Sequence, residues 1–296
     1  MPRTLLCICL AAAAAGAQSV SGPVLGWSAA PGGGIRIIYG VPGAARSATV
    51  RIPGGLRVLR MSPVSSSTLA ASGQSKALVI YDLATGDTTP LDGALPSPAA
   101  AEFSPRGTSI LLLDGTGSAQ VWKRDSAGFS LSDRFQFTAG RAAVSDDGSA
   151  VLGDTGGALV LRSAGMVTTL TAAPVDSFTF VAGTSMPAFH TAGQLVVGAN
   201  PALLDGAVQL ASPVPGRVLA LRDGTRLTLF DASGAVLADE ALDTPASGFA
   251  AVGRPDTVEL IGTPGNLLWL YDASVPRRFF VPAPQLRRFE RSEAQR

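Results

Sequence analysis

The sequence predicts an all-β protein built from repeated units of four short strands, and three observations support this fold class. An apolar strand that ends in an aromatic residue and an aspartate recurs at intervals near forty residues. The 34 glycines and 21 prolines interrupt the chain so often that no segment shows a capped helical period. Turn signals such as Asp-Gly fall between the apolar runs, as expected for hairpins.

The repeat is defined by its third strand. Aligned on the residue before the aspartate, successive copies are 42, 41, 39, 36, 33 and 41 residues apart, with a weak fifth copy near Val197. All three tyrosines of the protein occupy this aligned position, which scattered placement would rarely produce. A period near forty is a signature of repeat architectures. The structural positions that the repeat assigns are Tyr39, Tyr81, Asp82, Trp122, Leu161, Phe230, Asp231, Tyr271 and Asp272.

The other strands can be placed relative to the third. The first strand is small and apolar and often precedes a Ser-Pro or Ser-Asp turn, at 60–63, 102–107, 144–148 and 210–213. The second strand follows at 68–71, 110–113, 150–152, 218–221 and 258–261. A short Asp-, Gly- or Thr-rich hairpin then leads to the third strand. A glycine four to six residues beyond the aromatic position turns the chain into the fourth strand, at Gly43, Gly86, Gly128, Gly165 and Gly234.

A closed ring explains why such units can be stable. One four-stranded sheet cannot bury both faces, whereas sheets arranged in a ring bury each face against a neighbour. We therefore predict a β-propeller of four-stranded blades, with seven blades favoured. Six blades remain an alternative, because the fifth unit (175–205) is compressed. The first unit has strands near 24–27, 35–39 and 48–52 but no clear first strand, so we expect the C-terminal end to supply it or otherwise to latch the ring.

The first 17 residues have the features of a signal peptide. Arg3 supplies a basic start, residues 5–14 form a short apolar run, and Ala15-Gly-Ala17 provides small residues before the cleavage point. We expect export to the periplasm or the extracellular space after cleavage near Ala17. Cys7 and Cys9 both lie in this leader, so the mature chain is expected to contain no disulfide and no thiolate chemistry.

Charge is balanced overall but uneven along the chain. The full chain carries +1, and loss of Arg3 makes the mature chain neutral, so nothing recruits nucleic acid. Residues 18–283 are the predicted propeller and 284–296 a polar, Arg-rich tail. Residues 277–296 hold six arginines and two glutamates, which is +4. This tail is either a solvated, partly disordered terminus or a positively charged segment that contacts an acidic partner or envelope surface. No later run reaches 18 apolar residues, so we expect no transmembrane span. We also expect the protein to be a monomer.

The sequence offers little for catalysis, and we predict no catalytic, cofactor-binding or metal-binding residues. His190 is the only histidine and the sole candidate base for a Ser-His-Asp device, the alternative being a strand-end histidine bonded to backbone. One histidine and no mature cysteine leave zinc without ligands. Asp146-Asp147 and Asp239-Glu240 are pairs only, too few for calcium, and suit turns or a solvated face.

The repeated aspartates and aromatic residues have simple structural interpretations. We expect Asp82, Asp231 and Asp272 to accept hydrogen bonds from backbone N–H groups in the turn after the third strand. We expect the aromatic position to pack between blades rather than to stack on bases.

Two stretches carry a resemblance to known families. The Ser104-Pro-Arg-Gly107 turn and the Tyr-Asp strand ending resemble WD-repeat and TolB-like bacterial propellers. Segments 22–26 and 34–43 resemble secreted acidobacterial propeller proteins with no assigned activity, and the likeness covers roughly 21–283. There is no Trp-Asp dipeptide and no Gly-His partner, so the hydrogen-bond network of eukaryotic WD repeats is not expected. The stretch 82–86 is similar to the turn of quinoprotein propellers but occurs once and without their tryptophan, so no quinone cofactor is inferred.

Three functions remain open. Propellers of known function commonly bind on the face that bears the loops between the second and third strands and between successive blades, and here those loops are short. We therefore favour an exported, non-enzymatic module that binds a protein or peptide in the cell envelope. One alternative is a degenerate hydrolase or lactonase-like propeller with acids near the mouth of the ring. Another is a glycan-binding propeller, for which Trp27 is the only tryptophan near a loop.

Overall fold

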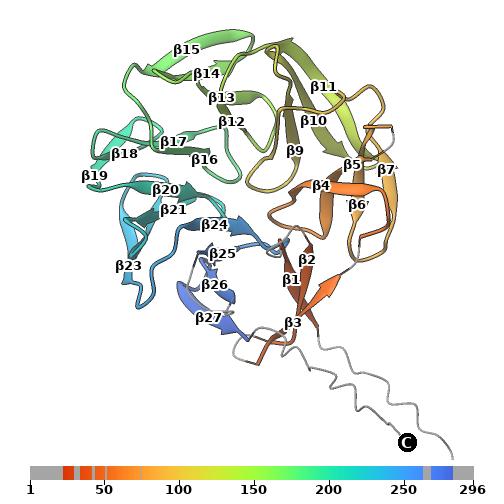
Figure 1. Ribbon diagram of the computed structural model, residues 1–296. Helices are drawn as coiled ribbons and strands as arrows, with labels where there is room; N and C mark the ends of the chain where they lie inside the picture. Colours follow the sequence, from red (N-terminus) through yellow and green to blue (C-terminus); the bar gives the residue numbers. More distant parts are fainter. Residues whose placement is uncertain are drawn as a thin grey trace, which may run out of the picture.

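The fold is described from a computed structural model that covers residues 23–282 with gaps at 30–33, 42–43, 51, 74 and 263–267. Seven antiparallel sheets lie around a common axis, and this described part of the chain contains no helix (Figure 1). The predicted all-β propeller with seven blades is confirmed. The six-blade alternative is wrong, because the compressed fifth unit still forms four paired strands.

Each blade is one sheet whose strands follow chain order. Blades 1 to 3 consist of β1 (Val24–Ala29), β2 (Ile35–Tyr39) and β3 (Arg46–Val50); β4 (Leu56–Met61), β5 (Ser67–Ser72), β6 (Leu78–Asp82) and β7 (Thr88–Pro90); and β8 (Ala100–Phe103), β9 (Ser109–Leu113), β10 (Ser118–Asp125) and β11 (Gly128–Gln136). Blades 4 and 5 consist of β12 (Arg141–Val144), β13 (Ala150–Asp154), β14 (Leu159–Ser163) and β15 (Met166–Thr171); and β16 (Ser177–Phe180), β17 (Pro187–Thr191), β18 (Gln194–Val197) and β19 (Asn200–Leu203). Blades 6 and 7 consist of β20 (Val208–Ala211), β21 (Arg217–Arg222), β22 (Arg226–Asp231) and β23 (Val236–Ala241); and β24 (Gly248–Ala251), β25 (Thr257–Ile261), β26 (Leu268–Asp272) and β27 (Arg277–Val281).

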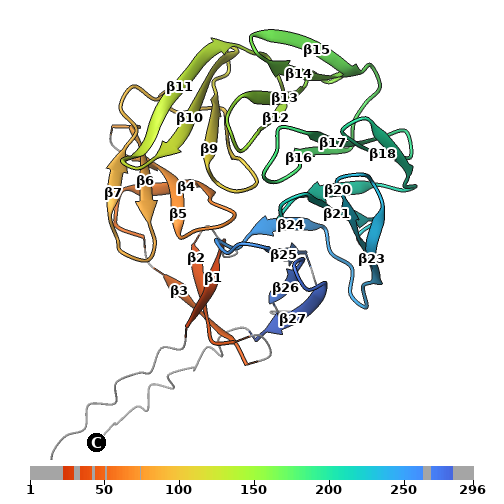
Figure 2. The ribbon, with the colours of Figure 1, turned by 180° about the vertical axis from the view of Figure 1, so that it is seen from behind.

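Burial changes along the radius of the ring. In blades 2 to 7 the first strand lies at the axis and the fourth at the rim, as the view from behind also shows (Figure 2). The second strand is covered on both faces by neighbouring blades, and all five residues of β9, Ser-Ile-Leu-Leu-Leu, are buried. Outer strands such as β7 and β15 are mostly exposed. A strand that is buried on both faces needs a continuous apolar run, which explains this pattern.

The core is divided among the contact surfaces between adjacent blades, which we call seams. Seven buried clusters occur, one at each seam, and each draws side chains from two blades. For example, Leu111 and Val121 of blade 3 pack with Val144 and Val151 of blade 4. No sheet therefore has a core of its own, which is the physical reason for the ring.

The aromatic position of the repeat does not have one orientation in all blades. Tyr81, Trp122, Phe230 and Tyr271 belong to the clusters that join their blade to the preceding one. Leu161, by contrast, packs at the seam with the following blade. Tyr39 likewise faces the following blade, whereas its neighbour Ile38 faces the preceding one. In blades 1 and 4 the aligned position is therefore shifted by one residue relative to the other blades. Because successive residues of a strand point to opposite faces, this shift turns the side chain toward the following blade.

Blade 1 differs from the others, as the sequence indicated. It has three strands among the described residues, β1, β2 and β3, and its third strand begins two residues before the predicted one. Blade 7 contacts β1 directly: the Trp27 amide donates a hydrogen bond of 2.5 Å to the Val252 carbonyl. Val252 also packs with Leu25 and Ile38 in the cluster at this seam. The expected C-terminal latch lies outside the described residues.

Several other expectations concern parts of the chain that the structure does not describe. The signal peptide 1–17, the boundary at residue 283 and the Arg-rich tail 284–296 all lie outside the described ranges. Among the residues that are described, no helix is long and apolar enough to cross a bilayer.

Candidate functional site

A cavity of about 560 Å³ lies on the axis of the ring and is the candidate binding site. Residues of all seven blades line it, mostly from the innermost strands and the turns that follow them. Blade 1 contributes Ala29 at the end of β1, Ile35 at the start of β2, and Gly34 immediately before β2. This volume is in the range of cavities that hold small ligands or peptide side chains. Much of the wall is apolar or proline, including Met61, Pro63, Phe103, Pro105, Pro213 and Phe249.

One ion pair lies in the wall of this axial cavity and joins blades 2 and 3. Arg60 of β4 donates from Nε to Glu102 Oε2 of β8 at 2.9 Å, and its Nη2 contacts Glu102 Oε1. The same Nε lies 3.2 Å from the Ala101 carbonyl oxygen. Burial lowers the pKa of Arg60 from its usual value. The carboxylate of Glu102 is therefore already engaged on both oxygens, and the cavity presents a polar patch rather than a free acid. Arg254 and Asp256 also line it.

His190 lies in β17 and is fully enclosed, with 1% of its surface exposed. Its Nδ1 is 2.7 Å from Asp176 Oδ2, and its Nε2 is 2.7 Å from the Leu204 carbonyl oxygen. A carbonyl oxygen can only accept, so Nε2 must carry a hydrogen in this arrangement. Both ring nitrogens are thus bonded to protein groups, and neither faces a hollow from which it could take a substrate proton.

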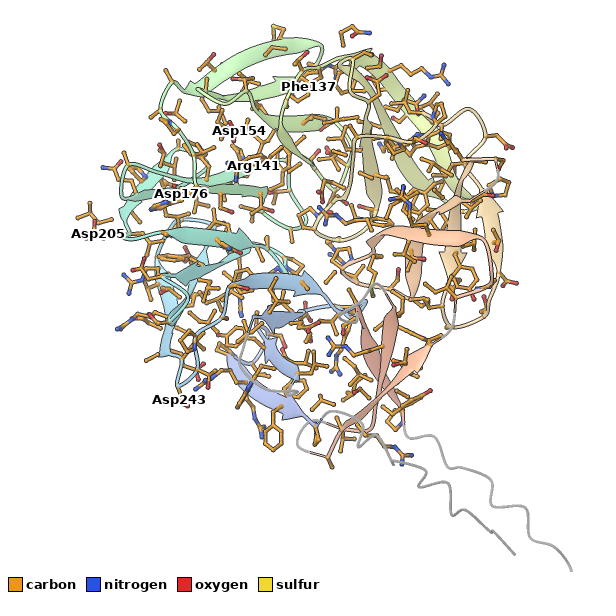
Figure 3. All side chains as sticks on the ribbon, viewed as in Figure 1. Phe137, Arg141, Asp154, Asp176, Asp205 and Asp243 are labelled. Atoms are coloured by element: carbon orange, nitrogen blue, oxygen red, sulfur yellow. The ribbon has the colours of Figure 1, made fainter. Side chains whose placement is uncertain are left out.

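Arg141 holds the polar network around this histidine together. It contacts Asp154 Oδ2 from Nε at 3.1 Å and donates from Nη1 to the Asp176 carbonyl at 2.7 Å and from Nη2 to the Val175 carbonyl at 2.6 Å. Figure 3 shows Arg141, Asp154 and Asp176 beside one another. This clamp joins blade 4 to the connection that enters blade 5. Sequence reasoning missed Arg141 and Asp176, because only the folded ring brings their segments together.

The repeated aspartates accept hydrogen bonds in the turns that follow the third strands. Asp231 Oδ1 accepts from the amides of Ser233 at 2.8 Å and Ala235 at 3.0 Å. The hydrogen bond from the Ser233 hydroxyl, together with these amides, lowers the pKa of Asp231. Asp82 and Asp272 make equivalent bonds to the amides two residues further on, at 2.8 and 3.0 Å. Asp272 also accepts from the Ser274 hydroxyl of its own turn, whereas Asp82 accepts from the Ser66 hydroxyl at 2.9 and 3.0 Å.

The paired acids at 146–147 and 239–240 also bond to protein groups. Asp146 joins three blades, because its Oδ1 accepts from the Arg106 amide of blade 3 at 2.7 Å and its Oδ2 from the Gly183 amide of blade 5 at 2.6 Å. Asp239 pairs with Arg226, which lowers the pKa of Asp239 to about 2, and Thr228 contributes in the same direction. Among the described residues no cluster of three or more His, Cys, Asp or Glu side chains is arranged to hold a metal ion.

The seam between blades 7 and 1 contains a buried acid that the sequence did not reveal. Glu259 of β25 is 6% exposed and accepts from Arg36 Nη2 of β2 at 2.7 Å. Burial raises the pKa of Glu259, against the opposing effects of Arg36 and Ser28. Its second oxygen, Oε2, is buried and has no hydrogen-bond partner among the described residues. A lone glutamate within an apolar strand was the available signal, but only the fold shows what it faces.

The expectation about Trp27 is wrong. Trp27 lies inside β1, not beside a loop, and is 6% exposed. Its ring packs in the seam with blade 2, together with Met61 and Tyr81. It therefore cannot stack on a sugar without opening the core, and it gives no support to glycan binding.

Several solved structures share the overall fold of this chain at low sequence identity. A functionally unknown protein from Desulfotomaculum acetoxidans matches with a TM-score of 0.54 and 10% identity, over 84% of this chain and 92% of that one. Hsv2 from Kluyveromyces marxianus matches with a TM-score of 0.51 and 12% identity, over 88% and 97%. The C-terminal WD40 domain of Sif2 gives 0.49 and 11%, over 90% and 88%.

The seven sheets and the axial cavity define the class of this protein as a seven-bladed β-propeller. At these identities the likeness shows the fold alone. No family model and no curated protein matches the chain.

Proposed function

We propose that this protein is an exported, non-enzymatic propeller that binds a protein or peptide at the axial cavity, as a binding or scaffolding module of the cell envelope. The observation that carries the proposal is the composition of the cavity wall. Apolar side chains and prolines surround the Arg60–Glu102 pair. Such a wall offers apolar contact to a peptide side chain and a charged pair to its polar groups, as the centres of protein interfaces do.

Binding can be tested with the purified mature chain and a displayed peptide library. Selected peptides are measured by fluorescence anisotropy against Arg60→Glu, Glu102→Arg and the double variant that carries both changes. We expect each single variant to weaken binding about tenfold or more, because it places like charges together in the cavity wall. Leu203→Ser, on the outer strand β19 where Leu203 is 84% exposed, is the control and should bind normally. Peptides that respond only to the Leu203 change would place the site at the rim and contradict the proposal.

A second candidate is a degenerate hydrolase or lactonase-like propeller, whose acids would be Asp256 and, once Arg60 is displaced, Glu102 of the same cavity wall. Ester, lactone, glycoside and phosphate substrates can be screened with the wild type, Glu102→Gln, Asp256→Asn and His190→Ala. Turnover that is lost with any of these variants would overturn the non-enzymatic proposal. Export is tested separately by expressing the full chain in a bacterial host and determining the N-terminus of the secreted product, which we expect to be Gln18.

A further inference from the structure

We propose that Arg254 makes the axial cavity a receptor for a carboxylate, so that the bound peptide presents an acidic side chain or its C-terminal carboxyl group there. This inference rests on the proposed function, because it names the chemistry that the same cavity recognises. Arg254 lies in the turn between β24 and β25 and lines the axial cavity. It also lines a second cavity of about 330 Å³, and among the described residues it alone lines both.

The charged side chains of the cavity wall are not equally available to a ligand. Arg60 and Glu102 are bonded to each other, and Glu102 is engaged on both carboxylate oxygens. Arg254, by contrast, forms no ion pair with another described residue. It is half-buried, so its charge is partly removed from water without an anion of the described chain to compensate. A ligand carboxylate therefore meets less competition from protein groups at Arg254 than at Arg60.

The turn that carries Arg254 differs in backbone conformation from the equivalent turn of blade 3. Residues 252–256 connect β24 to β25, and residues 104–108 connect β8 to β9. In blade 3 the fourth residue of the turn, Gly107, has a φ of +63°. Pro255 takes this place in blade 7 and cannot adopt a positive φ, because its ring fixes φ near −65°. The left-handed conformation falls instead on Asp256, with a φ of +63°.

Gly253 holds the start of this turn against blade 2. Its φ is +59°, and a Cβ there would lie 2.6 Å from the Ser65 carbonyl oxygen. Only glycine fits such a place, so the backbone that precedes Arg254 is fixed close to its neighbour. Arg106 stands at the same position of the blade 3 turn, yet it does not line the axial cavity. The two arginines thus form a matched pair, of which one faces the cavity.

A guanidinium in such a wall is suited to a carboxylate. Its planar N–H groups match the two carboxylate oxygens, so two parallel hydrogen bonds can form. The apolar and proline side chains around the cavity strengthen these bonds, because they lower the local dielectric constant. Asp256 also lines the cavity and opposes the approach of an anion. The neighbouring charges therefore predict opposite effects of substitution at 254 and 256.

Labelled positional-scanning peptide libraries, measured by fluorescence anisotropy on the mature chain, test the proposal. Each pool has one position fixed to one amino acid, and each is made with a free C-terminal carboxyl group and with an amide. We expect acidic pools, or pools with a free carboxyl end, to bind about tenfold more tightly than the matching asparagine, glutamine or amide pools. A preference for the free end alone identifies a chain terminus as the ligand, and a preference at internal positions identifies an acidic side chain.

Arg254→Gln should remove this preference while the uncharged pools still bind, which shows that the variant is folded. Arg106→Gln is the matched control and should keep the preference, because Arg106 is exposed and does not line the cavity. An equal loss in both variants would indicate a diffuse effect of net charge and would contradict a site at Arg254.

Asp256→Asn supplies a measurement of opposite sign. Asparagine tolerates the left-handed conformation of this position, so the turn is kept. Removal of the negative charge should tighten the binding of acidic pools about two- to threefold. Weaker binding of these pools, together with a preference for lysine or arginine pools, would show that the cavity recognises a cation and would overturn the inference.

The outcomes also separate this inference from the proposed function. Peptides that respond to the charge reversals at Arg60 and Glu102 but show the same acidic preference with Arg254→Gln would refute the carboxylate site and leave the proposed function standing. Absence of binding by every pool would refute both.

Discussion

At the scale of single residues, the polar side chains of this protein mostly serve the ring. Asp146 joins three blades through its two carboxylate oxygens. His190 has both nitrogens engaged, and the aspartates after the third strands accept hydrogen bonds from their own turns. The hydrogen bonds from Ser233 and Ala235 stabilise the charged form of Asp231 and lower its pKa. The acid stability of the protein should therefore depend in part on this aspartate.

The Asp239–Arg226 pair yields a prediction about pH. The pKa of Asp239 is about 2 in the folded protein against an ordinary value of 3.8, so the unfolded chain takes up the proton first as pH falls. The pair's contribution is complete above about pH 4 and is lost between about pH 4 and 2. Asp239→Asn should cost at most about 1 kcal/mol at pH 7, because the pair is partly exposed, and should flatten the pH dependence in this window.

Urea unfolding at a series of pH values measures this effect. Asp243→Asn is the control, since the Asp243 carboxylate is 90% exposed and lies 3.4 Å from its arginine partner. Equal acid sensitivity in wild type and Asp239→Asn would show that the Arg226 contact does not lower the pKa of Asp239.

At the scale of single elements, the second strands carry the tightest packing. They are covered on both faces, so small residues mark the places where a neighbour approaches closely. Gly153 in β13 is such a place: a Cβ there would overlap the ring of Phe137 and lie 2.9 Å from the Ala139 Cβ. Phe137 and Ala139 belong to the connection that enters blade 4, so the strand and its preceding connection pack as one unit.

Gly153→Ala should therefore destabilise the protein by about 1–3 kcal/mol, the usual cost of overpacking a core. Gly157→Ala, in the turn after the same strand, meets no atom within 4 Å and should change stability by less than about 0.5 kcal/mol. Denaturant unfolding measures the free energy of unfolding of the two variants and of the wild type. Similar stability of both would mean that Phe137 can move away at no cost.

At the scale of the whole molecule, the ring closes at the seam between blades 7 and 1. The described contacts at this seam are noncovalent. The Trp27–Val252 hydrogen bond and the cluster around Leu25 and Ile38 lie there. Gly26 permits this contact, because a Cβ at that position would lie 2.5 Å from the Val252 carbonyl oxygen. A side chain larger than hydrogen would push the two blades apart.

We expect Gly26→Ala to lower the Tm of a single cooperative transition by about 5 °C, as an overpacked seam affects every blade of the ring. Gly54→Ala, with no atom within 4 Å, is the matched control. Differential scanning calorimetry measures both. An unchanged Tm for Gly26→Ala would indicate that the two blades are not in close contact at this point.

The sequence predicted the architecture well because one repeated pattern indicates the strands, the turns between them and the closed ring of blades. For the same reason it indicated that blade 1 differs from the other blades, and the described residues of this blade form three strands. It could not predict which face Tyr39 and Leu161 present, since a shift of one residue hardly alters a spacing near forty but reverses the side chain. Contacts such as Arg141 with Val175, or Glu259 with Arg36, join segments of different blades, so no local pattern contains them.

The closing seam also determines how the molecule responds to tension. The two ends of the described chain adjoin β1 and β27, which belong to the two blades that meet there (Figure 1). A force applied between these ends acts across that junction first, while the other six junctions are bridged by continuous backbone. A pulling experiment should therefore find the earliest rupture between blades 7 and 1, with the remaining sheets peeling away afterwards from either side.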